Sequence, residues 1–235
     1  MLSSSNKIKA RTLNVSGPLD VYEVLPTDLS ANYPLRNAHS SIVCKGLSGT
    51  NPLEYQVKVS SYANNASLLQ ADGVYVLKSH MIARNLEDTL PMLNYEVDHV
   101  MLVNTSKDVQ DSLADKTAVT GLGLITKRHT IQEEAFDKPT VVAVVEHSNY
   151  NNAEMVIFKV AYYIRPVQNL LLIQPLFQVN REAVVNGYIV DYDPDNNCFI
   201  VDVTGINLTN GRETDKLSSP AVKSEDTILT PAGRA

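Results

Sequence analysis

The segment between residues 140 and 208 constrains the fold most, because short apolar runs alternate there with turn residues. Residues 141–145 and 155–163 are rich in β-branched and aromatic side chains, and the Asn-rich turn 149–152 separates them. Two such runs around a short polar turn are typical of a β-hairpin. Residues 168–174 lack this alternation and predict one or two helical turns. Two further strands are predicted at 182–191 and 198–208, joined by a turn at 193–197.

The earlier part of the chain repeats this order of elements. Strands are predicted at 12–25, 41–47, 54–62, 74–83 and 94–103, and a short helix at 64–70 follows the third of them. The loops 26–40 and 85–91 separate strands of this part. A strand at 118–127 and a long loop at 127–139 begin the second part. Each part therefore contains three strands, a short helix and two strands, which predicts an all-β protein with an internal repeat.

The composition of the connecting segments sets the expected domain boundaries. We expect a disordered N-terminus at 1–11, a first barrel at 12–104, a polar linker at 105–117, a second barrel at 118–208 and a disordered tail at 209–235. The tail has few large apolar residues to bury.

Charge, cysteine use and apolar runs exclude several classes of protein. A net charge of -6 argues against a polybasic nucleic-acid coat. Cys44 and Cys198 lie inside predicted strands and are expected to be small buried apolar residues, so we predict no disulfide and no metal site. The N-terminus lacks the apolar core of a signal peptide, and no apolar run is long enough for a membrane span. We expect an intracellular protein, nuclear or cytoplasmic, with no membrane contact.

Catalysis is not expected. The five histidines are His39, His80, His99, His129 and His147, and none lies in a nucleophile, zinc or phosphate-binding motif. The pair Glu146 and His147 follows an apolar strand, where polar residues at a strand end are the ordinary explanation. Gly121 and Gly123 lack the third glycine and the helix of a dinucleotide site. We therefore predict no enzyme, no catalytic residue and no cofactor.

Five strands with a helix between the third and fourth resemble the OB-fold, a small, partly open barrel. Gly73 and Gly187 lie at or near the start of the fourth strand of each part, where glycine lets a strand coil into a barrel. The chain is similar in element order to tandem OB proteins of the replication-protein-A type. The resemblance implies two tandem five-stranded OB-like barrels, each with a short helix between strands three and four. It also implies binding of single-stranded DNA or RNA, with DNA the first expectation.

In this family the ligand lies across strands two and three, between the loops that join strands one to two and four to five. That rule places candidate nucleic-acid-binding residues on both barrels. In the second barrel they are Lys127, Arg128, His129, Lys159, Tyr163 and Arg165, and in the first they are Arg36, Lys45, Lys58 and Tyr62. Cations would contact phosphates, while a Tyr ring would stack on a base.

Two other interpretations fit the same residues. An exposed strand face carries Lys and Tyr in many proteins without binding anything. Met155 and Ile157 share the face of Lys159, which also suits a protein partner or a homo-oligomer, so a protein-interaction scaffold built on OB-like barrels remains the alternative function. Tyr162 belongs to the opposite face with Phe158 and Val160, and we expect it in the core.

Overall fold

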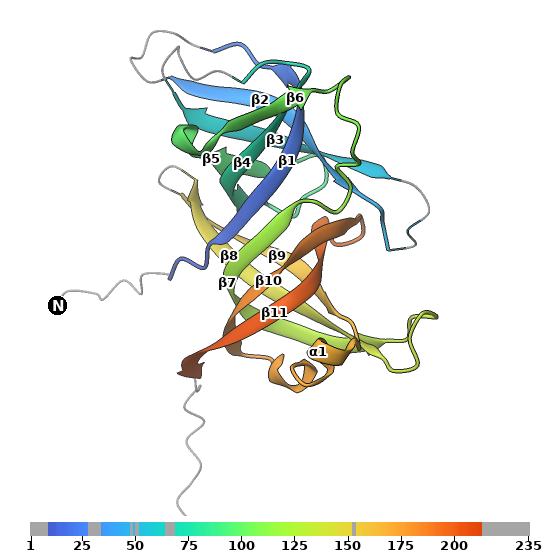
Figure 1. Cartoon of the computed structure of the whole chain (residues 1–235). Helices are drawn as coiled ribbons and strands as arrows, with labels where there is room; N and C mark the ends of the chain where they lie inside the picture. The colour runs from blue at the N-terminus through green and yellow to red at the C-terminus, as the bar shows by residue number, and fades with distance from the viewer. Residues whose placement is uncertain are drawn as a thin grey trace, which may run out of the picture.

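The structure is a computed structural model that describes residues 9–27, 34–47, 49, 52–63, 69–151 and 154–212. These residues form an all-β protein whose strands belong to one hydrogen-bonded sheet, which curls into two lobes (Figure 1). The predicted all-β class is confirmed. No helix among the described residues is long and apolar enough to cross a membrane.

The C-terminal half forms a closed five-stranded barrel. Its elements are β7 (Ala118–Ile131), β8 (Thr140–Asn151), β9 (Glu154–Ile164), α1 (Gln168–Leu171), the 3-10 turn η2 (Gln174–Leu176), β10 (Arg181–Asp193) and β11 (Cys198–Arg212). Antiparallel pairings join β7 to β8, β8 to β9, β10 to β11 and β10 to β7, while β9 and β11 pair in parallel and close the barrel. The short helix α1 lies between the third and fourth strands of this half, as the sequence predicts.

Alternating side chains and glycine allow this closure. Every second residue of β9, including Phe158 and Tyr162, is buried in the core. Gly187 lies at a register shift in β10, and a Cβ there would clash with the backbone carbonyl of Asp202. Only glycine lets β10 and β11 approach this closely.

The N-terminal half has pairings in the same cyclic order. Its elements are β1 (Leu13–Val24), β2 (Leu35–Cys44), β3 (Leu53–Tyr62), β4 (Gly73–Ile82), β5 (Met92–Tyr95), the 3-10 turn η1 (Val97–His99) and β6 (Met101–Thr105). The pairings run from β1 to β2, β3, β5 and β4 and back to β1, and β6 adds to the outer edge of β4. Residues 64–68 of the helix predicted at 64–70 lie outside the described residues, and residues 69 and 70 form no helix.

Several predicted boundaries are wrong, and backbone pairing explains each of them. β2 begins at Leu35 inside the predicted loop 26–40, because its polar first half pairs residue by residue with β3. The predicted strand 94–103 is divided by η1 into β5 and β6, which pair with different segments of β4. β7 continues to Ile131, within the predicted loop 127–139, because it pairs with β8.

The hairpin and the chain ends also differ from the prediction. β8 continues to Asn151 through most of the predicted turn at 149–152, and residue 152 lies outside the described residues. β11 extends to Arg212, so residues 209–212 of the predicted tail form strand, and residues 213–235 lie outside the described residues.

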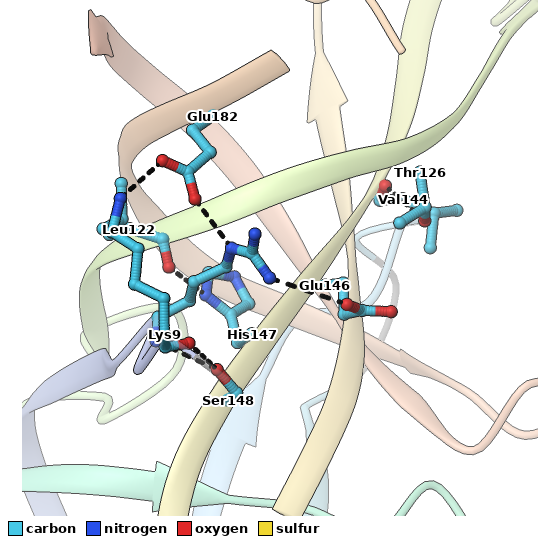
Figure 2. A network of polar contacts seen from close by, with 9 residues as sticks. Lys9, Leu122, Thr126, Val144, Glu146, His147, Ser148 and Glu182 are labelled. Carbon is cyan, nitrogen blue, oxygen red and sulfur yellow. Dashed lines mark hydrogen bonds and ion pairs between the residues drawn. The ribbon is translucent and has the colours of Figure 1, made fainter. Parts of the chain in front are cut away.

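Lys9 and Arg11 are bonded to the C-terminal barrel. Arg11 forms a β-bridge with Ser148 of β8 and is 9% exposed. Its Nε donates to Glu182 of β10 at 2.9 Å, and Lys9 Nζ donates to the same carboxylate at 2.6 Å (Figure 2). The prediction of disorder for residues 1–11 is therefore wrong at this residue, while residues 1–8 lie outside the described residues. The ion pairs and the β-bridge therefore hold residues 9–11 against β8 and β10.

The two halves share a continuous core and a bonded junction. Residues 13–16 of β1 pair with residues 118–121 of β7, so one strand contributes to both lobes (Figure 1). The segment expected as a linker at 105–117 is also held: Asp115 N donates to Val43 O at 3.0 Å, and its side chain accepts from Lys45 N at 2.9 Å. From β10, Asp191 accepts a 2.6 Å hydrogen bond from the Tyr55 hydroxyl. These bonds fix the position of one half relative to the other.

Candidate nucleic-acid interface

The outer face of β8 and β9 carries a groove of about 560 Å³, here called the β8–β9 groove. Polar side chains at its sides come from β7, β9 and the β10–β11 turn: Lys127, His129, Lys159, Tyr163, Asp193 and Asn196. Its floor is apolar and formed by Val142, Val144, Ala161 and Cys198. The groove therefore gathers Lys127, His129, Lys159 and Tyr163, four of the six candidates predicted for this half.

Strand phase decides which residues reach the groove. On β9, Lys159 is exposed and Tyr163 half-buried, while the neighbouring Phe158 and Tyr162 point into the core. On β7, Lys127 and His129 line the groove, whereas Arg128 between them is exposed and does not line it. A two-residue period puts Arg128 on the opposite face of the strand.

The two lysines of the groove are not neutralised. Among the described residues neither Lys127 nor Lys159 forms an ion pair. Asp193 also lines the groove, but its carboxylate accepts from Asp195 N at 2.9 Å and Asn196 Nδ2 at 2.7 Å. These bonds hold the carboxylate in its own turn and away from an ion pair with either lysine, although its negative charge remains in the groove.

Tyr163 presents a fixed aromatic ring. The ring packs against a small buried cluster made of Ala161, Val190, Cys198 and Ile200. Partial burial, followed by the nearby charges of Asp193 and Glu133, raises the pKa of the Tyr163 phenol, so the ring is neutral at physiological pH. A ring that is packed on one side loses little conformational entropy when a ligand stacks on the other.

Arg165 directly follows the end of β9, and its charge is compensated. Its Nη1 donates to Asp202 at 2.8 Å, and its Nε lies 3.5 Å from a carboxylate oxygen of Glu133. Burial raises the pKa of Asp202 more than the Arg165 charge lowers it. Of the two predicted cations in this segment, Lys159 is thus exposed to the groove and Arg165 is held between two carboxylates.

Asn85 completes the groove, and the sequence prediction missed it. This residue of the β4–β5 connection lines the groove and has a positive φ of 51°. Its side chain accepts from Lys159 N at 2.6 Å and donates to Lys159 O at 3.1 Å and to Asn197 O at 2.8 Å. At Lys159 the Asn85 side-chain amide thus makes the backbone hydrogen bonds that a neighbouring strand would otherwise make. The sequence offers one indication of this role, an Asn just after a predicted strand, because Asn adopts positive φ more readily than most residues.

The candidates of the first half are not gathered into one site. Lys45 is exposed near the junction, and Lys58 is half-buried on β3 opposite His39 of β2. Arg36 lies near the start of β2, opposite Ser61 of β3. Tyr62 is 60% exposed and lines a separate pocket of about 360 Å³. The two cysteines, Cys44 and Cys198, are buried free thiols, as predicted.

The described residues offer no cluster of three His, Cys, Asp or Glu side chains that could hold a metal ion. Burial, with the Asp115 and Asp191 charges, raises the pKa of the Cys44 thiol to about 12. Burial and Asp193 raise that of Cys198 to about 11. Both sulfurs are therefore protonated and poorly nucleophilic at neutral pH.

Comparison with known proteins supports the fold assignment. No protein-family model and no curated protein sequence matches this chain. The wild-type single-stranded DNA-binding protein from Thermus aquaticus has a similar structure, with a TM-score of 0.50 and 11% identity over 91% of this chain and 96% of that chain. A deletion mutant of that protein gives a TM-score of 0.48 at 11% identity, over 88% and 97% of the two chains. A replication protein A heterotrimer bound to ssDNA gives 0.24 at 9% identity, over 88% and 51%. The predicted resemblance to OB-fold single-strand-binding proteins is confirmed at the level of fold.

Proposed function

We propose that this chain binds single-stranded nucleic acid, DNA in preference to RNA, through two tandem OB-like barrels, with the β8–β9 groove as the main site. The observation that carries the proposal is that two lysines without ion pairs and a packed Tyr ring line one groove, within the described residues. Lysines that follow phosphates and an aromatic ring that stacks on a base are the usual chemistry of single-strand binding.

The position of the groove supports this proposal. It lies over the second and third strands of the C-terminal barrel, and Asn196 comes from the β10–β11 connection, one of the two that flank the ligand in OB-folds. Lys127 comes from the part of β7 that leads to the other connection. The cyclic pairing order of β1 to β5 supports a second OB-like barrel in the N-terminal half. DNA is favoured over RNA because the Thermus aquaticus protein of similar fold is named for binding single-stranded DNA.

Lysine substitutions in the groove test the phosphate contacts. We expect Lys127→Ala to weaken binding of labelled single-stranded DNA and to reduce the slope of log affinity against log salt by about 0.7. Fluorescence anisotropy at several salt concentrations, with single-stranded RNA and duplex DNA as competitors, measures both quantities. Arg128→Ala is the matched control, because it removes a cation from the next residue on the opposite strand face. Equal effects of the two substitutions would mean that binding follows net charge and not the groove.

Tyr163 tests the stacking contact. We expect Tyr163→Ala to weaken single-strand binding by about 1–3 kcal/mol, because a stacked base loses its platform. Tyr163→Phe keeps the ring and should retain most of the affinity in the same titration. Arg165→Ala should act differently, because it leaves Glu133 and Asp202 without their cation and is expected to lower the melting temperature more than the affinity. If Tyr163→Phe and Tyr163→Ala weaken binding equally, the hydroxyl and not the ring makes the contact.

A protein-interaction scaffold is the second candidate function, and strand β6 favours it. Among the described strands β6 pairs with β4 alone and forms one end of the strand order, and Met101, Leu102 and Val103 are 60%, 59% and 50% exposed. Exposed apolar residues on an edge strand are typical of a surface that pairs with another chain. Two results together would favour the scaffold. The wild-type protein would bind no single strand in the titrations above, and sedimentation would show a dimer or a larger species.

A further inference from the structure

A second pocket lies where the two halves meet, away from the β8–β9 groove. Its volume is about 360 Å³, which is at the small end of the range for ligand sites. Residues of β3, β4 and β5 form one side, and the end of β8 forms the other. In Figure 1 the β8–β9 hairpin rises from the lower lobe toward β5. The pocket therefore needs both halves of the chain.

Three Tyr rings and two Asn amides line this pocket, together with His80, the Glu96 carboxylate and smaller or apolar side chains. Tyr95 is only 5% exposed, whereas Tyr62 and Tyr150 are 60% and 51% exposed. Asn94 and Asn151 add side-chain amides, which both donate and accept hydrogen bonds. No Lys or Arg is among the described lining residues, so the pocket does not suit a phosphate. Flat rings together with amides suit a neutral heteroaromatic ring, as in a nucleobase.

His80 adds a second observation that points to a ligand. Its Nδ1 is buried and has no hydrogen-bond partner in the described structure, and the residue lines the pocket. Buried polar atoms without a partner are rare in folded proteins, because each loses its hydration without compensation. Because the nitrogen is closed to water in this conformation, a base edge in the pocket could pair with it only after the His80 ring rotates.

Strand β9 connects this pocket to the β8–β9 groove. Tyr150 pairs with Met155 at the start of β9, and Lys159 in the groove is four residues further along, or about 13 Å at the rise of a strand. Arg84 lies along this path, where its Nη2 contacts Glu154 at 2.6 Å in an exposed ion pair. Its Nη1 also donates to the other Glu154 oxygen at 3.4 Å, so the pair is bidentate, but it is exposed and a phosphate can compete with Glu154 for Arg84.

We propose that the pocket between Tyr62, Tyr95 and Tyr150 holds a nucleobase of the strand that is bound in the β8–β9 groove. The inference rests on the proposed function and extends it. The β8–β9 hairpin of the C-terminal half and strands of the N-terminal half would together form one base-binding pocket. The phosphates of the strand follow Lys159 and Arg84 along β9, and one base turns into the pocket against Tyr150.

Methionine methyl NMR on the full chain tests the pocket with a free nucleoside. Met92 lines the pocket and Met101 lies on β6 outside it, so the two methyl groups serve as probe and control. Deoxyadenosine should shift the Met92 signal in a saturable way and leave the Met101 signal unchanged. Tyr150→Ala should abolish the shift and Tyr150→Phe should retain it. An unchanged Met92 signal in the wild-type protein, or a shift that persists in Tyr150→Ala, overturns the proposal.

Oligonucleotides of two lengths separate this inference from the proposed function. Tyr150→Ala should weaken binding of a strand long enough to reach both sites about tenfold, and leave binding of a strand that fills only the groove unchanged. Lys127→Ala should weaken binding of both strands. If Lys127→Ala acts as expected and Tyr150→Ala has no effect at either length, the pocket inference fails and the proposed function stands. If the wild-type protein binds neither strand, the proposed function fails, and this inference fails with it.

Discussion

Replacing Tyr162 with alanine is expected to lower the free energy of unfolding by about 3–5 kcal/mol, the range for truncating a buried aromatic side chain. Tyr162 is fully buried, at 0% exposure, inside the C-terminal barrel. Its hydroxyl lies 2.8 Å from Nε2 of His147, which is also buried. The substitution therefore leaves a cavity and removes the partner of a buried ring nitrogen. Urea unfolding followed by circular dichroism measures the change.

Two further variants separate the causes of this loss. Tyr162→Phe keeps most of the volume and removes only the hydroxyl, so we expect about 1–3 kcal/mol from the unsatisfied His147 nitrogen. Lys159→Ala, an exposed residue on the opposite face of the same strand, should change stability by less than about 0.5 kcal/mol. A larger loss for Lys159→Ala than for Tyr162→Ala would reverse the assignment of the two strand faces.

The sequence predicts the faces of β9 correctly because alternation is a local property. A two-residue period assigns Lys159 and Tyr163 to the outside and Phe158 and Tyr162 to the core without knowledge of any other strand, and the observed burial agrees. The same reasoning gives the order of strands and the short helix of the C-terminal half, which is the basis of the OB-like prediction.

Contacts between distant segments explain what the sequence does not predict. Asn85 is 74 residues from Lys159, and nothing local indicates that its amide bonds to the backbone of β9. The compensation of Arg165 depends on Asp202 in β11 and Glu133 before β8. The polar start of β2 resembles a loop, but its backbone pairs with β3 and therefore forms strand. In each case tertiary pairing overrides the local pattern.

Lowering the pH from 7.5 to 4.5 is expected to reduce the free energy of unfolding by about 2 kcal/mol through His147 alone. Burial lowers the pKa of His147 from 6.5 to about 4, although its hydrogen bond to Leu122 O opposes this shift. Nδ1 donates to Leu122 O at 2.8 Å (Figure 2), and Nε2 accepts from the Tyr162 hydroxyl at 2.8 Å, so the neutral ring is fully bonded. Below pH 6.5 His147 is protonated in the unfolded chain, whereas in the folded protein it stays neutral until about pH 4. The free energy of unfolding therefore falls between these two pH values.

Protonation of Glu182 lowers the free energy of unfolding further at lower pH, and its effect can be separated from that of His147. Burial raises the pKa of Glu182, but the bonds and charges of Lys9 and Arg11 outweigh it, so the folded pKa lies below 4.5. Its stabilising contribution is therefore complete at pH 7 and is lost only as the pH falls below that value. His147→Gln, whose amide still donates and accepts, should remove the loss between pH 6.5 and 4.5 and keep the loss below it. Urea unfolding of both proteins across this range checks the assignment, and a loss above pH 4.5 that persists in His147→Gln would transfer the acid sensitivity to another group.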